Sequence, residues 1–162
     1  LTWVPGDTGI ADPDAPTTTE LGAAGALDLS CLMVTTYEVR ADGSDTTNER
    51  AVCEDANVVV PTVRNYMGNL VMFRKFLNGE PETDDVIENF TDAGVLGWFV
   101  RRNGFAYDTA YADGQIIEVY KFLSDVPQIQ GGTGEGYLKA TVPLLQQGVF
   151  RTRTVIGGES SS

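Results

Sequence analysis

The sequence predicts a mainly β, antiparallel domain, either a sandwich or a barrel-like fold, with one short α-helix on its flank. Three observations predict this class. Side chains alternate with a period of two along 66–73 and 138–144, as strands require. Asn-Gly at 103–104 and Asp-Gly at 113–114 are hairpin turn signals. Helical spacing of apolar residues is convincing only within 83–92.

A chain of 162 residues favours a single domain. Residues 1–26 contain four glycines and three prolines without a sustained period, so we expect an extended N-terminal arm or plain disorder there. The β domain is expected over 27–156. The end, 157–162, reads "GGESSS" and is expected to be a flexible tail.

The first strand is expected in "LDLSCLMV", residues 27–34, with Leu27, Leu29, Cys31 and Met33 on one side. A polar loop with Asp-Gly and Asn turn residues follows at 41–50. The run 64–76 alternates but has no purely polar face. Both of its faces are therefore expected to be buried, inside the domain or against other copies.

The expected helix lies near 83–92. Thr83 is suited to cap it, two aspartates follow at its positive end, and Gly94 is suited to end it. The apolar stripe consists of Val86, Ile87 and Phe90. Strands resume at 95–104, at 115–123 and from 137 onward. Pro143 cannot donate to a ladder, which predicts an edge or a bulge at that point.

The charge balance excludes several function classes. Eleven basic and 23 acidic residues give a formal charge of −12, which disfavours nucleic-acid binding by phosphate neutralisation and disfavours anionic membranes. No apolar run is long enough to span a bilayer. The first residues, "LTWVPGDTGIADPD", lack the basic and apolar regions of a signal peptide.

Cysteine and histidine usage narrows the chemistry further. The chain has no histidine, which excludes His-based triads and the commonest metal ligand. Cys31 and Cys53 cannot make a four-cysteine zinc site. They could pair in a disulfide or lie in the core as free thiols, and a reducing compartment is the simpler assumption.

The glycine-rich stretch "GGTGEG", residues 131–136, raises the question of a phosphate-binding loop. Such a loop needs a helix after its glycines, whereas a period-two strand follows here. We therefore expect a connecting loop at 124–136. The carboxylates of "ADGSDTTNE" fail the EF-hand spacing, although a calcium-bound loop there stays open. No Gly-x-Ser-x-Gly elbow and no facing carboxylate pair can be nominated. We expect no catalytic residue, no metal site and no cofactor.

The order of several stretches resembles the major tail tube protein of long, non-contractile-tailed (siphovirus-type) phages, particularly those of actinobacterial hosts. The resemblance covers about residues 15–156. Its motifs are weak singly, and their order carries the likeness. The stretches are "PTTTELGAAGALDLSCLM", "AVCEDANVVVPTVRNYMGNLVMFR", "TDDVIENF", "GVLGWFVRRNG", "FAYDTAYADGQIIEVYKF" and "GYLKATVPLLQQGVF".

The resemblance implies a β-sandwich with a flanking helix that forms hexameric rings, stacked as the tail tube of a virion. Double-stranded DNA would pass through an acidic lumen without specific binding. Assembly would take place in the host cytoplasm. Its implied partners are other copies of the chain, a tape measure protein, a tail terminator and tail-tip proteins, with no membrane.

Three groups of residues are candidates for contacts between copies in such a tube. The loop candidates are Asp42, Asp45, Asn48, Glu49, Asp125, Gln130 and Glu135. The N-terminal arm candidates are Thr17, Thr19 and Leu21. The candidate partners for acidic surface on a neighbouring copy are Arg101, Arg102, Arg151 and Arg153, whose alternative is a solvated strand end.

Two other function classes remain open from the sequence. One is a β-sandwich binding or decoration module on a virion or cell surface, which would stay a discrete particle. The other is a hydrolase without histidine that uses paired carboxylates, whose turnover would be lost on a single Asp or Glu change. Concentration-dependent polymerisation distinguishes the tube protein from both.

Overall fold

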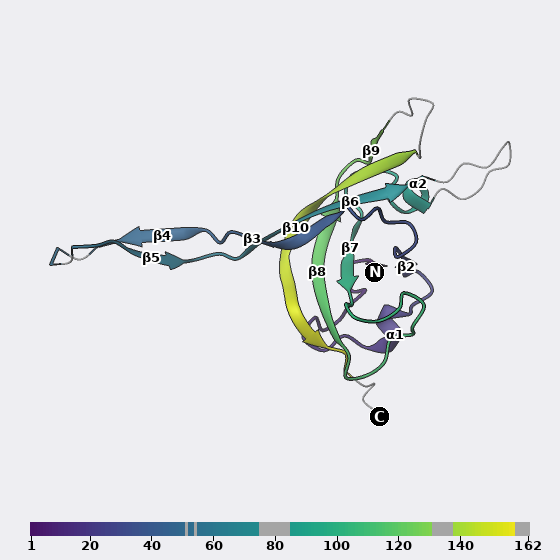
Figure 1. The fold of residues 1–162 in the computed structure, drawn as a ribbon, viewed down its shortest axis with the longest axis horizontal. Helices are drawn as coiled ribbons and strands as arrows, with labels where there is room; N and C mark the ends of the chain where they lie inside the picture. Colours follow the sequence, from purple (N-terminus) through teal and green to yellow (C-terminus); the bar gives the residue numbers. More distant parts are fainter. Residues whose placement is uncertain (51, 54, 75–84, 131–137, 158–162) are drawn as a thin grey trace.

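The computed structural model describes residues 1–50, 52, 53, 55–74, 85–130 and 138–157. It confirms a mainly β, antiparallel fold with the expected short flanking helix. Figure 1 shows a curved body from which one hairpin projects far to the side. The elements, in order, are β1 (Thr2–Pro5), α1 (Thr18–Leu21), β2 (Leu27–Asp28), β3 (Glu38–Asp42), β4 (Thr46–Glu49), β5 (Val58–Pro61), β6 (Asn65–Phe73), α2 (Asp85–Asn89), β7 (Leu96–Arg101), β8 (Ile116–Ser124), β9 (Gln128–Ile129) and β10 (Lys139–Val155).

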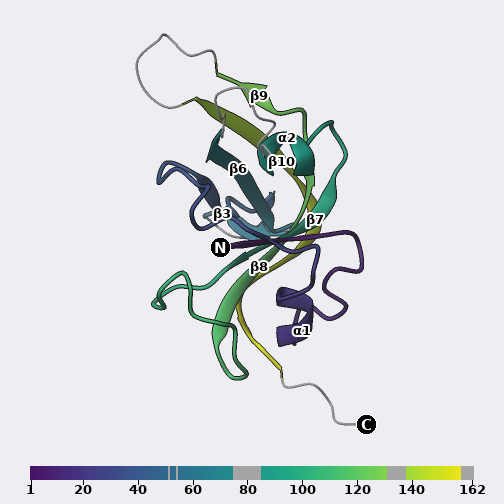
Figure 2. The same cartoon turned by 90° about the vertical axis from the view of Figure 1, so that its right-hand side faces the viewer.

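The body is built on one continuous antiparallel sheet of eight strands in the order β2-β1-β7-β8-β10-β6-β3, with β9 added beside β10. The long strand β10 gives the sheet its curl. Its first part pairs with β6 and its second part with β8, and Leu144 pairs with both Gly68 and Ser124. The register with β8 shifts between Gln146 and Phe150, around Gly148 at a φ of 76°. A bulge of this kind bends a strand, so the sheet folds over itself as a single layer that curls back (Figures 1 and 2).

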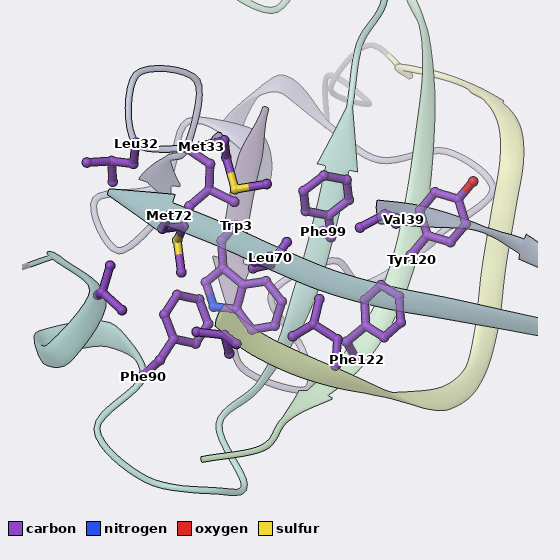
Figure 3. Packing of buried hydrophobic residues seen from close by; sticks show 14 of the residues in the cluster. Trp3, Leu32, Met33, Val39, Leu70, Met72, Phe90, Phe99, Tyr120 and Phe122 are labelled. Atoms are coloured by element: carbon purple, nitrogen blue, oxygen red, sulfur yellow. The ribbon is translucent and has the colours of Figure 1, made fainter. Parts of the chain in front are cut away.

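Both faces of the curled sheet carry apolar clusters. The larger cluster joins β6, β3 and the first part of β10 to β1, β7 and β8, and therefore lies inside the curl (Figure 3). There the rings of Trp3 and Phe90 meet edge to face at 5.2 Å between centroids, which fixes α2 against β1. The smaller cluster, on the outer face, gathers Val4, Ile10 and Trp98 with residues of α1 and β8. Adjacent residues of β1 thus serve opposite faces, as strand geometry requires.

The N-terminal segment differs from the extended arm that the composition suggested. β1 pairs with β7 along its whole length and with β2 at Thr2 and Trp3. Trp3 is buried, and Gly97 on the opposite strand provides the space for its ring, because a Cβ on Gly97 would overlap that ring. Helix α1 begins with a capping box formed by Thr17 and Glu20. Tertiary partners, not local periodicity, order this segment.

The expected strand at 27–34 is wrong beyond Asp28. The Asp28 side chain accepts from the Ser30 amide at 2.8 Å, and the Leu29 carbonyl accepts from the amides of Leu32 and Met33. This turn ends the strand and sends Leu29 inward. Cys31 is exposed and free, as is Cys53, so neither the core position nor the disulfide holds.

The later expectations agree better with the structure. β6 buries Tyr66, Gly68, Leu70 and Met72 on one face and half-buries the other. α2 falls inside 83–92 and buries Val86, with Phe90 buried just after its end. The proposed cap Thr83 and the neighbouring Asp84 lie outside the described residues.

The two Gly turns and Pro143 occur at sheet positions that suit them. Gly104 and Gly114 have φ values of 87° and 80°, but the link between β7 and β8 is a long loop, 102–115, not a tight hairpin. Pro143 lies where β10 loses its neighbour between the end of β8 and the start of β9, and its carbonyl accepts from the Asp125 amide at 2.9 Å. The interruption predicted there is confirmed.

Candidate functional site

The projecting hairpin, residues 43–64, is the most exposed apolar element of the described chain. Its strands β4 and β5 pair only with each other, from Thr46 opposite Pro61 to Glu49 opposite Val58. Both faces are in solvent, yet β5 carries three consecutive valines that are each more than half exposed: Val58, Val59 and Val60 at 52%, 57% and 53%. A long apolar strand with an open edge is a site for pairing or packing with another chain.

A set of polar contacts joins the hairpin to the body. The Asp45 amide donates to the Val63 carbonyl at 2.9 Å, and the Thr62 amide donates back to the Asp45 carbonyl at 2.7 Å. The Asn65 side-chain amide donates to the Gly43 carbonyl and to Asp45 Oδ1, both at 3.1 Å. Gln146 Nε2 in turn donates to Asn65 Oδ1 at 3.2 Å. These contacts form a hinge that holds the hairpin in line with β3 and β6.

Tyr66 anchors the hairpin beyond this hinge. Its hydroxyl donates to the Lys121 carbonyl at 2.5 Å and accepts from the Gln147 amide at 2.7 Å, so it spans the bulge of β10. Its ring packs against Phe122 and Phe150 at 5.1 and 4.9 Å. Burial raises the pKa of Tyr66, partly offset by the backbone amides that it accepts from. The phenol therefore stays a neutral donor.

Arg101 adds a second anchor, from β7 across the curl to β3. Its Nη1 donates to the Val39 carbonyl at 3.0 Å and its Nε to Glu118 Oε2 at 3.1 Å. Tyr120 also donates to Glu118 Oε2, at 2.9 Å. Burial opposes the charged form of Arg101, but its bonds to Glu118 and Tyr37 outweigh burial and raise its pKa. The hairpin root is thus tied to the body by a partly buried ion pair.

The structure gives the predicted loop residues two different roles. Asn48 and Glu49 lie exposed on β4, where a neighbouring copy could reach them. Asp42 accepts from the Gly43 amide at 2.8 Å beside the hinge, and Asp45 is itself part of the hinge. The expected irregular loop at 41–50 is wrong, because its residues pair along β3 and β4.

The second group of predicted loop residues lies at the other end of the sheet. Asp125 accepts from the Val126 amide at 2.7 Å where β8 ends. Gln130 is exposed, and its amide donates to the Lys139 carbonyl at 3.0 Å beside β9. Glu135 and the glycine-rich stretch 131–136 lie outside the described residues. The structure does not bring this group together with the projecting hairpin.

Three of the four predicted charge partners have contacts within the chain. Arg101 binds Glu118, as described above. Arg151 binds Asp14 through two nitrogens, and this bond lowers the pKa of Asp14. Arg102 donates to backbone carbonyls of the loop 102–115. Arg153 is exposed on β10. Arg101 is only 20% exposed, so its charge is directed inward.

The N-terminal candidates also turn inward. Thr17 caps α1, and its hydroxyl accepts from the Glu20 amide at 3.3 Å. Thr19 lies half-buried within α1. Leu21 is buried in the outer cluster of its own chain, so it differs from the exposed contact that the sequence suggested. The reason is that α1 packs on the sheet.

Chemistry beyond packing has little support in the described residues. Within them, no group of three or more Asp, Glu, Cys or His side chains is placed to hold a metal ion. None of the helices in the described part of the chain has the length and apolar character needed to cross a bilayer. What the described surface offers is an exposed apolar hairpin on a rigid body, which is suited to protein–protein contact.

A family model for phage tail tube proteins matches residues 1–159 of this sequence. The chain belongs to the phage tail tube protein family. It is therefore a structural, non-enzymatic component of the virion tail, which agrees with the resemblance noted in the sequence. The match includes the first residues, where the sequence alone offered no recognisable pattern. A search of curated proteins finds no match.

Sequence reasoning missed two exposed features of this tail tube protein. The valines of β5 were taken as part of the lead into the next strand, although "NVVVP" joins three β-branched residues to a proline that suits an edge strand. The aromatic residues Phe105 and Tyr107 are half or more exposed on the loop 102–115. The pattern "NGFAYD" of a turn followed by spaced aromatics is the signal that could have found them.

Proposed function

We propose that this tail tube protein polymerises as stacked hexameric rings and forms the tube of a long, non-contractile, siphovirus-type tail of a phage with an actinobacterial host. The observation that carries the proposal is the projecting hairpin. Its three adjacent valines are exposed on a hairpin whose strands have no other partner in the chain. Another copy of the chain covers these valines in the tube and so removes apolar area from water.

The hinge makes the hairpin useful for assembly. Asn65, Asp45 and Thr62 fix its direction before a second copy arrives, and Tyr66 and Arg101 fix its root to the body. A pre-organised element loses less conformational entropy when it binds. The tube therefore grows from folded subunits whose contact element already has the bound shape.

The acidity of the chain suits the passage of double-stranded DNA. Six chains at −12 each give a ring a formal charge of −72. Four cations of the described residues are bound to carboxylates of their own chain: Arg40, Arg101, Lys121 and Arg151. DNA in the lumen meets few cations that can hold its phosphates, so it slides without specific binding. Lysine in place of carboxylates that line the bore will slow DNA ejection, and unchanged ejection kinetics contradict this point.

The remaining partners follow from the tube. A tape measure protein occupies the lumen during assembly in the host cytoplasm. A tail terminator closes one end, and tail-tip proteins start the other. No membrane takes part. These partners share one property, which is that each contacts a ring surface and not an isolated subunit.

Shortening of the projecting hairpin tests the proposal. Replacing residues 46–61 by a two-residue Asn-Gly turn joins β3 to β6 directly while the body keeps its core. We expect a folded monomer at every concentration in sedimentation velocity, whereas the unaltered chain forms rings or tubes as concentration rises. The matched control is Val126→Ser, which removes a valine of 55% exposure elsewhere on the body and should leave assembly unchanged. Tubes from the shortened chain contradict the proposal.

A further inference from the structure

The side of the body opposite the projecting hairpin carries a hollow of about 420 Å³. It lies between the start of β1, helix α1 and the loop 102–115. Figure 1 shows α1 on the right and the projecting hairpin on the left, and Figure 2 looks onto this face with the hairpin behind it. The apolar lining comes from Leu1, Leu21, Ala23, Ala26, Phe105, Ala106, Tyr107, Ala110 and Tyr111.

Arg102 holds the aromatic wall of this hollow in place. Its guanidinium stacks on Phe105 and Tyr111, at 4.9 and 4.6 Å from the ring centroids. Its Nη1 also donates to the Ala110 carbonyl at 2.9 Å and to Gln115 Oε1 at 2.8 Å. The loop is therefore pre-organised, although the Phe105 and Tyr107 side chains are 50% and 67% exposed. Rigid, exposed aromatic side chains beside a hollow are typical anchors of a protein interface.

Tyr111 couples the wall to β1. Its hydroxyl and Thr2 Oγ1 are 2.7 Å apart, and burial raises its pKa, opposed in part by the Thr2 hydrogen bond and the Arg102 charge. The wall and floor of the hollow thus form one unit with the central sheet. This unit has the rigidity that a receiving site needs.

We propose that this hollow receives the projecting hairpin of a second copy of the chain, with the β5 valines packed against Phe105 and Tyr107. The inference rests on the proposed tube and names the surface that the hairpin binds. The two surfaces lie on opposite sides of one subunit, so a hairpin cannot reach the hollow of its own chain (Figure 1). A contact between two different surfaces is heterologous, and repetition of such a contact builds rings or stacks.

Reach and charge agree with this occupant. At about 3.3 Å per residue, the strand from Asp45 to Cys53 extends about 26 Å beyond the hinge, enough to enter a neighbouring subunit. Arg50 follows β4 near the hairpin tip and is exposed, while Asp28 and Asp108 line the hollow. An arginine of one copy thus meets carboxylates of the other, which favours this pairing over hairpin-to-hairpin contact.

Disulfide trapping tests the contact directly. In a Cys31→Ser, Cys53→Ser background, Val59→Cys and Tyr107→Cys are combined in one chain and assembled under mild oxidation. We expect ladders of covalently linked chains on non-reducing gels from assembled material. The control pair, Val59→Cys with Val126→Cys, should give no ladder.

Blocking the hollow gives a second measurement. Ala110→Trp fills the hollow from its wall, and Val126→Trp is the control for an added surface tryptophan. We expect Ala110→Trp and the triple variant Val58→Ser, Val59→Ser, Val60→Ser each to raise the concentration needed for assembly at least tenfold, with circular dichroism unchanged. Tubes that form normally without the 59–107 crosslink, or an Ala110→Trp variant that assembles like the parent, overturn the docking alone. Failure of the unaltered chain to assemble overturns the tube and the docking together.

Discussion

Arg101→Met will destabilise the subunit by cutting the tie between the body and the root of the projecting hairpin. The substitution keeps most of the side-chain length while removing the guanidinium. It leaves the Val39 carbonyl without the donor at 3.0 Å, and it leaves Glu118 with its bonds from Tyr120 and Asn103 but without its cation. The remaining carboxylate is then a charge in a poorly hydrated position.

The magnitude follows from how exposed the ion pair is. Breaking a fully buried pair costs about 3–5 kcal/mol, and an exposed pair is worth less than about 1 kcal/mol. The Arg101 and Glu118 side chains are 20% and 18% exposed, which places them nearer the buried limit. Including the lost bond to Val39, we expect about 2–4 kcal/mol of lost stability.

Urea unfolding followed by tryptophan fluorescence measures this loss. We expect a lower midpoint with an unchanged slope, because the surface exposed on unfolding stays the same. The double variant Arg101→Met, Glu118→Leu should be more stable than the sum of the two single changes predicts, since it removes the stranded carboxylate.

The control is Glu38→Gln, which breaks the exposed pair between Glu38 and Arg40 and should leave the midpoint unchanged. A loss below about 0.5 kcal/mol for Arg101→Met, or strict additivity in the double variant, would refute the assignment of Arg101 as an internal anchor.

Three further changes test other parts of the account. Gly97→Ala should cost about 1–3 kcal/mol in urea unfolding, since its Cβ overlaps the Trp3 ring and lies 2.9 Å from the Val4 carbonyl oxygen; an unchanged midpoint contradicts that packing. Burial, with the bond to Glu118, raises the pKa of Tyr120 to about 12 from an ordinary value near 10, so its contribution to stability is present below pH 10 and is lost as the pH rises toward 12. Tyr120→Phe should flatten that alkaline loss in urea midpoints measured from pH 9 to pH 11.5, and an identical pH dependence in the variant argues against the shift. Asn65→Ala should speed amide exchange in β4 and β5 while global unfolding changes little; unchanged exchange there means that Asn65 is no part of the hinge.

Local signals predicted the body of the fold well. Alternation in 66–73 and 138–144 identified two central strands, because one face of each is buried inside the curl. The N-terminal segment could not be predicted in this way. β1 has only four residues and becomes a strand because β7 and β2 supply its hydrogen bonds and Gly97 makes space for Trp3. The failed strand at 29–33 shows the converse, since the Asp28 turn overrides a period-two pattern.

The assembly surface was only partly predictable for a similar reason. The candidates Asn48 and Glu49 do lie on the exposed hairpin, but Leu21 and Arg101 lie inside the subunit. Their fates depend on which elements pack together over long sequence separations. The hollow opposite the hairpin is a meeting of β1, α1 and the loop 102–115, and no local pattern encodes such a meeting.

Negative-stain electron microscopy of the purified, unaltered chain at rising concentration tests the central claim most directly. Stacked rings with six-fold symmetry in end views, and a bore wide enough for duplex DNA, are the result that the account predicts. Only dispersed particles at every concentration, even after a tail-tip initiator is added, would contradict the claim that this chain assembles into the tube through its own exposed surfaces.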